Sequence, residues 1–287
     1  MTVSPCILHA TMGNIPLVSC LVLNYRMPRD AVRCVQALRQ QTIANQLEII
    51  VADNHSDDDS IGILRNRLGE QMGVRIVEIP ANLGYSRGNN RGAAYAKGKY
   101  LLITNPDNEL EPGALEHMVR TLEQDASIGI IALKLVHPDG TRRDSFRRFP
   151  SAMDIILKRL PLRKLAHKRL ERYLRRQEEP TDPIDADWVV GTCILISTEL
   201  FRSLGGFDER FFLFFDDIDL CRRCWITGKR VVFDPRISAR ERQERLSEGG
   251  MFSLLMSRVG RTHIASAIKY FWKWRGQPLP AKTLCFR

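Results

Sequence analysis

The most constraining feature of this chain is a series of short apolar runs that each end abruptly in polar residues. Four of the runs have the length and the valine, isoleucine and leucine content of buried strands: Leu17–Leu23, Leu47–Ala52, Val74–Ile79 and Tyr100–Thr104. Segments with helical spacing of apolar residues lie between them: Ala31–Leu38, Ile61–Leu68 and Asn90–Ala96. This alternation predicts an α/β fold with a Rossmann-like, mostly parallel sheet flanked by helices on both faces.

Polar clusters follow three of these predicted strands. They are Asn24-Tyr25, Asp53–Asp57 and Asn105-Pro106-Asp107. In open parallel sheets, ligands bind beyond the carboxyl ends of the strands. We therefore expect a ligand site at this edge of the sheet.

The chain changes character after Pro150. Ser151–Gln177 mixes leucine and isoleucine with cations, Trp188–Ile196 has sheet-like composition, Glu199–Leu204 is a short predicted helix, and Ser253–Trp274 has helical spacing. The predicted organisation is one domain over residues 1–250, with a basic helical insert at about 151–180. A basic amphipathic helical tail follows over residues 251–287.

The net charge of +10 is concentrated in two blocks. Arg142–Gln177 holds 13 lysines and arginines against three acidic residues, and Met251–Arg287 holds seven and no acid. Such blocks suit an anionic partner, either a membrane or a nucleic acid. The first block has few interleaved aromatic residues, which disfavours nucleic acid. The tail adds apolar residues at about helical spacing, which favours an anionic membrane surface: Ile264, Ile268, Phe271, Trp272 and Trp274.

The location predicted from the sequence is cytoplasmic. We expect no membrane span, because no apolar run approaches the roughly 20 residues that a span needs. We also expect no signal peptide, because the N-terminus lacks a charged region followed by an apolar run. Seven scattered cysteines suit free thiols in a reducing compartment. Cys221 and Cys224 form a Cys-x-x-Cys pair, but no second pair or nearby histidine completes a metal site. We interpret this pair as ordinary helix packing.

Two turns are candidates for binding phosphate and metal. Asn82–Asn90 joins a strand to a helix with glycines and Arg87, a pattern that favours a phosphate but also fits a solvated turn. Asp107 is the acid of the strand-end turn, where one carboxylate could anchor a hard divalent cation against a diphosphate. A simple strand-terminating turn is the alternative for this second segment.

The strongest cluster is Phe211–Leu220, in which five apolar residues run into three acids. Carboxylates beside packed aromatic rings are partly desolvated, which raises their pKa toward values useful to a general base. Asp216 and Asp217 can also be acids at the start of a helix over Ile218–Ile226. Both interpretations can hold together.

Taken in order, these motifs resemble the family 2 glycosyltransferases with the GT-A fold. The resemblance covers roughly Pro16–Gly250 and is carried by Val18–Tyr25, Val51–Asp57, Asn82–Asn90, Asn105–Asp107, Trp188–Gly191, and Gly205–Glu209 followed by Asp216-Asp217. Ser145–Pro150 and His263–Phe271 are similar to segments of bacterial rhamnosyltransferases of surface-polysaccharide assembly.

The resemblance implies inverting sugar transfer from a nucleotide-diphosphate donor, with dTDP-rhamnose as the best candidate. Asp217 matches the general base, Asp107 the second acid of a DxD motif that binds Mn²⁺ or Mg²⁺, Asp53 the contact to the nucleotide base, and Asn24 a neighbour of the ribose. The remaining donor-side candidates are Asn54, Asn82, Gly84, Arg87 and Asn105, and the acceptor-side candidates are Trp188, Gly191 and Asp216. The implied acceptor is a lipid-linked saccharide at the inner face of a bacterial membrane. Among other classes, a nucleotidyltransferase and a basic nucleic-acid-binding protein are the alternatives.

The chain departs from the family pattern at two positions. The first DxD position is Asn105, which leaves less charge for a metal. Relatives often carry a histidine after the strand at Arg230–Phe233, as a third metal contact, whereas this chain reads Ser238–Arg242 without one. Glu241 could substitute, Arg240 or Arg242 could neutralise the diphosphate directly, or metal binding could be weak.

Overall fold

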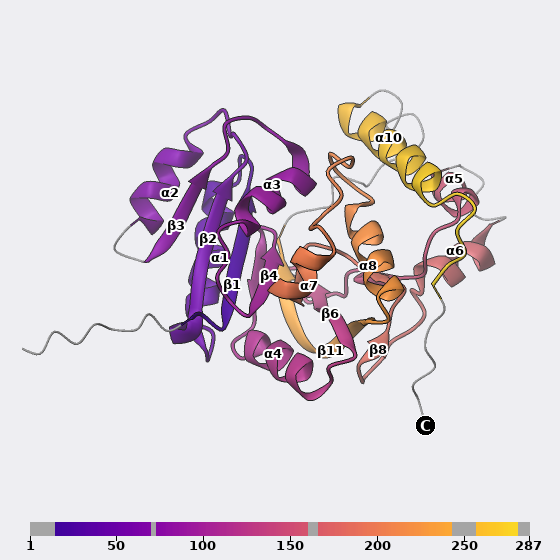
Figure 1. The fold of residues 1–287 in the computed structure, drawn as a ribbon, viewed down its shortest axis with the longest axis horizontal. Coiled ribbons are helices and arrows are strands. Elements are labelled where there is room, and N and C mark those ends of the chain that lie inside the picture. Colours follow the sequence, from indigo (N-terminus) through magenta and orange to yellow (C-terminus); the bar gives the residue numbers. More distant parts are fainter. Residues whose placement is uncertain (1–14, 70–72, 160–165, 243–256, 281–287) are drawn as a thin grey trace, which may run out of the picture.

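The computed structural model describes residues 15–69, 73–159, 166–242 and 257–280. A nine-stranded sheet runs through the molecule, and helices cover it (Figure 1). Its strands are β1 (Val18–Asn24), β2 (Leu47–Asp53), β3 (Val74–Glu78), β4 (Tyr100–Thr104), β5 (Asn108–Leu110), β6 (Ile128–Val136), β8 (Ile184–Asp185), β10 (Cys193–Ser197) and β11 (Arg230–Glu241). A separate two-stranded sheet pairs β7 (Phe146–Arg147) with β9 (Trp188–Val189).

The helices connect and flank these strands. They are α1 (Pro28–Arg39), the 3-10 turn η1 (Ala44–Gln46), α2 (Ser60–Leu68), α3 (Gly84–Ala93), α4 (Ala114–Gln124), α5 (Ala152–Arg159), α6 (His167–Leu174), α7 (Thr198–Ser203), α8 (Asp216–Ile226) and α10 (Arg258–Lys273).

The sheet has the order β3-β2-β1-β4-β10-β6-β11-β5, and β8 pairs with β11. Its first four strands are parallel, as the sequence predicts, whereas β10 is antiparallel to both of its neighbours. Alternate residues of β1 enter two separate cores: Leu21 and Leu23 on one face, Cys20 and Val22 on the other. Burial on both faces explains why the predicted strands are continuous apolar runs.

Among the element boundaries that differ from the sequence prediction, three lie in segments that carry the recognised motifs. The helix predicted at Asn90–Ala96 begins earlier, at Gly84, because the left-handed φ of this glycine lets the chain turn directly into the helix. The run Trp188–Ile196 is not one strand: it splits into β9 and β10 around Gly191. The strand predicted at Arg230–Phe233 continues to Glu241.

The basic insert forms α5 and α6, which are joined by an ion pair between Arg169 and Asp154 (2.6 Å). Leu170, Tyr173 and Leu174 of α6 are buried. The insert is therefore packed onto the body of the protein through one face of α6.

Among the described residues, no helix combines the length and apolar character needed to cross a membrane.

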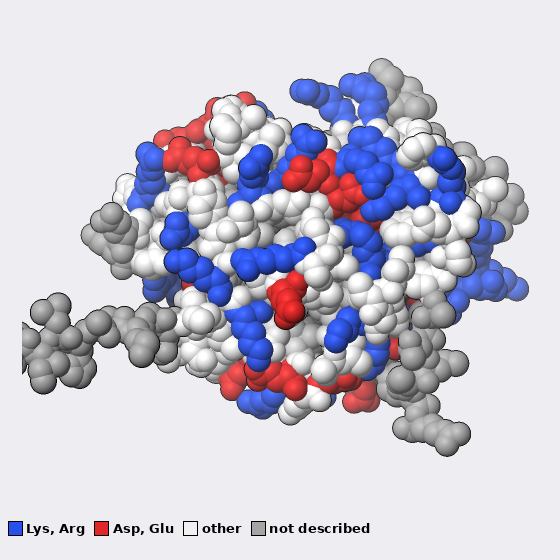
Figure 2. Space-filling view, in the orientation of Figure 1, with Lys and Arg blue, Asp and Glu red and all other residues white. Residues whose placement is uncertain are grey.

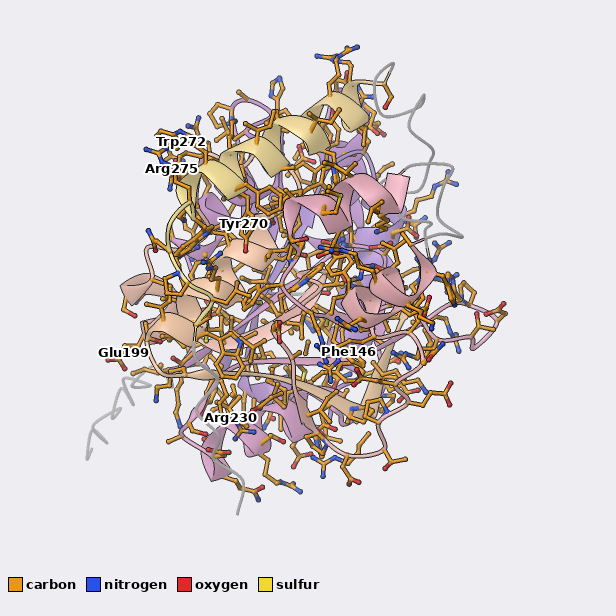
Figure 3. All side chains as sticks on the ribbon, turned by 90° about the vertical axis from the view of Figure 1, so that its right-hand side faces the viewer. Phe146, Glu199, Arg230, Tyr270, Trp272 and Arg275 are labelled. Carbon is orange, nitrogen blue, oxygen red and sulfur yellow. The ribbon has the colours of Figure 1, made fainter. Side chains whose placement is uncertain are left out.

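Helix α10 lies beside α8 and the loop that precedes it (Figure 1). Tyr270 and Trp274 are buried on its inner side, whereas Ile268 and Trp272 are 64% and 63% exposed. Figure 3 shows Trp272 and Arg275 on the outer side, with Tyr270 turned toward the body. The expectation that Trp274 faces a membrane is wrong, because its indole donates a hydrogen bond to buried Asp219 (2.9 Å).

Candidate active site

The carboxyl ends of β1 and β2 are tied together by side chains. Asn24 Nδ2 donates to Asp53 Oδ1 (2.7 Å), and Ser56 donates to the same carboxylate from its hydroxyl (2.6 Å) and its backbone N–H (2.9 Å). Both Asn24 and Asp53 are buried. The strands end in register, Asn24 opposite Asp53, so parallel pairing brings together two residues 29 positions apart. The two side chains form a fixed polar surface at this edge of the sheet.

A second polar group orders the approach to α3. Asn54 Nδ2 donates to Asn82 Oδ1 (3.0 Å) and to the carbonyl of Gly84 (3.3 Å), while Asn54 Oδ1 accepts from the N–H of Leu83 (3.1 Å). Asn82 Oδ1 also accepts from the N–H of Gly84 (3.0 Å). Asn54 and Asn82 thus hold the start of α3 against the end of β2.

Gly84 connects this loop to the acidic cluster. Its φ is +80°, and a Cβ there would overlap the carbonyl oxygen of Phe212. That carbonyl accepts a hydrogen bond from the N–H of Tyr85 (2.6 Å), and the Tyr85 hydroxyl donates to the carbonyl of Gly191 (2.8 Å). A glycine is required here because the two loops touch backbone to backbone.

The Asn105-Pro106-Asp107 turn joins β4 to β5 at the same edge of the sheet. The N–H of Asn105 and the side-chain amide of Asn108 both donate to the carbonyl of Thr192, at 2.7 and 2.5 Å. Asp107 is buried, and its carbonyl accepts from the N–H of Arg242 (3.1 Å). Antiparallel β10 therefore fixes this turn one residue from Gly191.

The acids of the Phe211–Leu220 cluster stand on a strained turn. Phe214 and Phe215 both have left-handed backbones, with φ of 69° and 65°, and α8 begins at the next residue, Asp216. Such conformations cost of order 1–3 kcal/mol each for non-glycine residues and persist only where packing enforces them. Asp216 and Asp217 therefore lie in the first turn of α8, two residues earlier than predicted.

The two acids have different surroundings. Asp216 is buried, and burial, with the nearby Asp217 and Asp219 carboxylates, holds its pKa well above the usual range. Asp217 is half-buried, and its two oxygens accept from the N–H groups of Gly191 (3.2 Å) and Ile218 (2.8 Å). The desolvation expected from the aromatic run thus acts on Asp216. Asp217 is the more accessible of the two, in a fixed orientation.

Helix α10 packs against the Phe214-Phe215 turn. Ser266 donates to the carbonyl of Leu213 (2.8 Å), and the ring of His263 lies against Phe214 and Phe215, with ring centres 5.0 and 5.3 Å apart. The third acid, Asp219, points into this interface, where Lys273 approaches it to 2.6 Å. Asp219 is thus a structural anchor for α10.

The residues at this edge of the sheet that could bind a metal ion are Asp107 and Asn105. Glu241, one candidate for the missing third contact, is buried in an ion pair with Arg143 (2.9 Å). Arg242 pairs with Glu109 (2.5 Å), and Arg240 is exposed. Within the described residues, no group of three or more histidine, cysteine or acidic side chains is placed to hold a metal by itself. Mg²⁺ and similar ions are commonly held by one or two carboxylates plus substrate phosphates, and Asp107 fits that arrangement.

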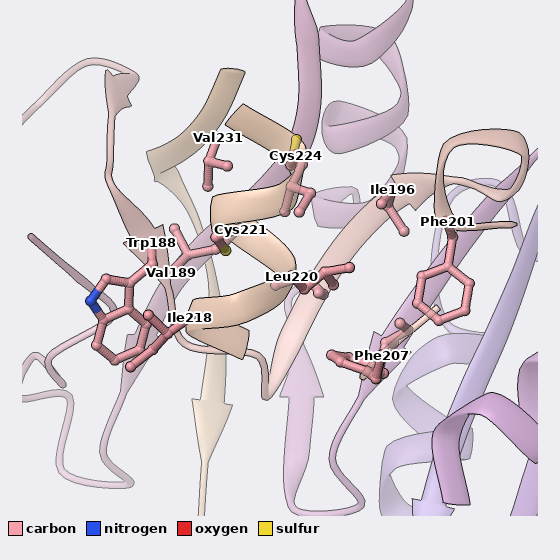
Figure 4. Close-up of a cluster of buried hydrophobic side chains, with 14 of the residues drawn as sticks. Trp188, Val189, Ile196, Phe201, Phe207, Ile218, Leu220, Cys221, Cys224 and Val231 are labelled. Atoms are coloured by element: carbon pink, nitrogen blue, oxygen red, sulfur yellow. The ribbon is translucent and has the colours of Figure 1, made fainter. Parts of the chain in front are cut away.

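The remaining sequence candidates lie apart from this cluster or in the core. Arg87 forms a long surface ion pair with Glu209 (3.4 Å). Cys221 and Cys224 are buried free thiols on α8, and burial raises the pKa of Cys224 to about 12 (Figure 4). The helix-packing interpretation of this pair is confirmed. Trp188 lies beside Ile218, directly after Asp217 in the chain (Figure 4).

Sequence reasoning missed several residues that build this site. Ser56 and Tyr85 stood inside recognised motifs without an assigned role, and Asn108 follows the Asn105–Asp107 turn directly. Their position within or next to a motif was the available signal. Ser266 and His263 also stood inside a recognised segment, His263–Phe271, but nothing in the sequence linked it to the turn, because α10 is about 50 residues away along the chain.

Comparison with known proteins gives one family. The profile described as "Glycosyl transferase family 2" matches residues 19–205. An N-acetylglucosaminyl-diphospho-decaprenol L-rhamnosyltransferase of Mycobacterium tuberculosis is 25% identical over 245 residues, covering 80% of this chain and 77% of the relative. A chondroitin synthase of Escherichia coli is 30% identical over 122 residues, covering 42% of this chain and 18% of the synthase.

Two solved structures share the fold. GalNAc-T7 with UDP, GalNAc and Mn²⁺ matches with a TM-score of 0.67 at 16% identity, over 92% of this chain and 49% of that one. The mannosyltransferase PcManGT of Pyrobaculum calidifontis, with GDP-Man and Mn²⁺, matches with a TM-score of 0.58 at 18% identity, over 88% of this chain and 64% of that one. The GT-A fold predicted from the sequence is confirmed.

Proposed function

Because this chain belongs to glycosyl transferase family 2, we propose that it is an inverting transferase that moves L-rhamnose from dTDP-rhamnose to a hydroxyl of a lipid-linked saccharide. Glycosyl transfer follows from the family. The choice of donor and acceptor is supported by the similarity to the mycobacterial L-rhamnosyltransferase, whose name includes a diphospho-decaprenol acceptor.

The observation that carries the proposal is a continuous hydrogen-bonded path along one sheet edge. Asn54 holds the start of α3, Tyr85 links α3 to Gly191, and Gly191 donates to Asp217. The next residue, Thr192, holds the turn that contains Asp107. Donor-side loops and a carboxylate thus lie on one rigid frame, which suits a reaction that depends on positioning two substrates.

In the proposed reaction, Asp217 accepts the proton of the acceptor hydroxyl while the hydroxyl oxygen attacks the anomeric carbon. The bond to the nucleoside diphosphate breaks on the opposite face, so the configuration is inverted. Each oxygen of Asp217 accepts an N–H bond, which holds the carboxylate that would take the proton in a fixed orientation. A positioned base of this kind contributes roughly 10²–10⁴-fold to the rate.

The leaving diphosphate needs charge stabilisation. Asp107, with Asn105 beside it, would hold a divalent cation together with donor phosphate oxygens. When bound, this cation neutralises the charge that grows on the departing diphosphate. On the protein side, Asp53, Asn24 and the Asn82–Gly84 loop form the surface against which we place the nucleoside, and the exposed Arg87 is proposed for the phosphates.

We further propose that the protein acts in the cytoplasm, attached peripherally to the inner face of a bacterial membrane. Lysine and arginine side chains gather over α10 and its surroundings, at the upper right of Figure 2. On the outer face of α10, exposed Ile268 and Trp272 lie one turn apart, and Arg275 stacks on Trp272 at 4.2 Å. Cations near anionic lipid contribute about 1 kcal/mol each, and aromatic residues anchor at the interface.

Product analysis tests the enzymatic proposal. The wild-type protein is incubated with dTDP-rhamnose and a panel of other nucleotide sugars, with and without Mn²⁺, and slow donor hydrolysis is followed by chromatography. Nucleoside diphosphate as the product supports a glycosyltransferase, whereas pyrophosphate indicates a nucleotidyltransferase. Hydrolysis that favours another donor over dTDP-rhamnose would refute the rhamnosyl assignment.

Vesicle flotation tests the location. The protein should float with phosphatidylglycerol vesicles at low salt and be released as salt screens the charges. Trp272→Ser and Arg275→Gln together should weaken flotation, whereas Arg67→Gln, at an exposed position of α2 far from α10 (Figure 1), should not. Absence of binding at low salt would refute the membrane proposal alone.

A further inference from the structure

The Ser145–Pro150 motif has no role in the reaction proposed above, yet the fold brings it beside the acidic turn. β7 pairs antiparallel with β9, so that Arg147 lies opposite Trp188. The N–H of Val190 donates to the carbonyl of Ser145 (2.9 Å), and the following residue, Gly191, donates to Asp217. Arg147 and the carboxylate of Asp217 are therefore joined through one short, hydrogen-bonded segment.

The side chain of Arg147 is held in place by its neighbours. Its guanidinium carbon lies 5.3 Å from the centre of the Trp188 ring, and the N–H of the next residue, Arg148, donates to the carbonyl of Tyr173 (3.1 Å). Tyr173 is buried on α6 of the basic insert. Burial raises the pKa of Tyr173, and among the charged groups that act on it Arg147 lowers this pKa while Asp217 raises it.

The charge of Arg147 is weakly compensated by the protein. Its side chain is only 11% exposed, and its ion pair with Asp144 is long, at 3.6 Å. Asp144 is closer to Arg176, which donates to it at 3.0 and 3.1 Å. The Nε of Arg147 has no hydrogen-bond partner among the residues that the structure describes. A largely buried cation with incomplete pairing is costly unless an anion completes its hydrogen bonds.

We propose that Arg147, stacked on Trp188, binds the diphosphate of a prenyl-diphosphate-linked acceptor. The inference rests on the proposed function, because it identifies the chemical group of the acceptor that the protein binds next to Asp217. The planar guanidinium suits phosphate oxygens because it donates two parallel hydrogen bonds. We assign this anion to the acceptor because the Ser145–Pro150 motif is tied through Val190 and Gly191 to Asp217, the proposed base for the acceptor hydroxyl. The enzyme thus recognises the phosphate end of its acceptor through β7, which is bonded to the insert at the carbonyl of Tyr173 by the N–H of the next residue, Arg148.

Calorimetric titration tests this assignment. Enzyme saturated with dTDP, so that the donor site is filled, is titrated with farnesyl diphosphate, farnesol and inorganic diphosphate. Arg147→Gln should weaken farnesyl diphosphate binding at least about tenfold, the scale expected from losing hydrogen bonds to a charged group. The matched control is Arg148→Gln, because Arg148 is the exposed neighbour whose contacts to Tyr173 and Trp188 are made by its backbone. That variant should bind within about twofold of wild type.

Three outcomes would overturn the inference: equal binding by Arg147→Gln, equal weakening by Arg148→Gln, or farnesol binding as tightly as farnesyl diphosphate. Inorganic diphosphate that binds as tightly, with the same dependence on Arg147, would assign the site to free diphosphate instead. If Arg147→Gln fails a melting check, Arg147→Lys replaces it, with weakening expected because one ammonium cannot form the paired bonds. Donor hydrolysis by the wild type tests the proposed function separately, so the two failures are distinguishable.

Discussion

Replacing Trp274 with phenylalanine should remove a hydrogen bond between the C-terminal end of α10 and α8 and so lower the free energy of unfolding. The indole N–H donates to Asp219 Oδ1 at 2.9 Å, and both residues are buried. A hydrogen bond to a charged group contributes about 1.5–3 kcal/mol to stability. Asp219 retains Arg223 and Lys273 as partners, so the carboxylate is not left alone and we expect a loss of about 2 kcal/mol. The smaller ring leaves a cavity that adds to this loss.

Thermal and urea unfolding measure the effect, with Trp272→Phe as the control. Trp272 lies two residues away on the same helix but is 63% exposed. A loss of about 2 kcal/mol corresponds to a fall of roughly 4–8 °C in melting temperature for a domain of this size. Trp272→Phe should stay within about 0.5 kcal/mol of wild type. If the two variants unfold alike, the bond to Asp219 does not hold α10 in place.

Four further predictions concern the acidic turn, the metal and the backbone. Asp217→Asn should retain donor binding and lose about 10²-fold or more of transfer in a product assay; near-wild-type transfer with an inactive Asp216→Asn would instead make Asp216 the base. Asp107→Ala should abolish the gain in dTDP affinity on adding Mn²⁺, and an unchanged gain in titrations would show that Asp107 is not a ligand. Gly84→Ala should destabilise more than Gly140→Ala, since both have left-handed φ but only Gly84 faces a backbone carbonyl; equal melting temperatures would contradict this. The pKa of Asp216 is raised in the folded protein, so its carboxyl group loses its proton less readily there than in the unfolded chain. The free energy of unfolding of the wild type should therefore fall relative to that of Asp216→Asn as pH rises from about 4 through the folded-state pKa. A difference between the two proteins in urea unfolding that does not change with pH would refute this expectation.

The strands that build the site could be predicted because their signal is local. β1, β2 and β4 are buried on both faces, so each appears in the sequence as a continuous apolar run. The polar residues that end these runs were located for the same reason. The helix at Gly84 was placed too late, since a left-handed glycine that starts a helix cannot be told from one in a turn by composition.

The sequence alone determined the parallel half of the sheet, the polar residues at its edge and the family, because short-range hydrophobic patterning and motif order carry that information. Only the tertiary structure decided how individual side chains are used. Of three neighbouring acids, Asp216 is buried, Asp217 faces Gly191, and Asp219 anchors α10. Glu241, free to bind metal as far as the sequence could tell, is paired with buried Arg143. These partners lie 26 to 98 positions apart in the chain, and a carboxylate's role depends on which distant cation or N–H the fold brings to it.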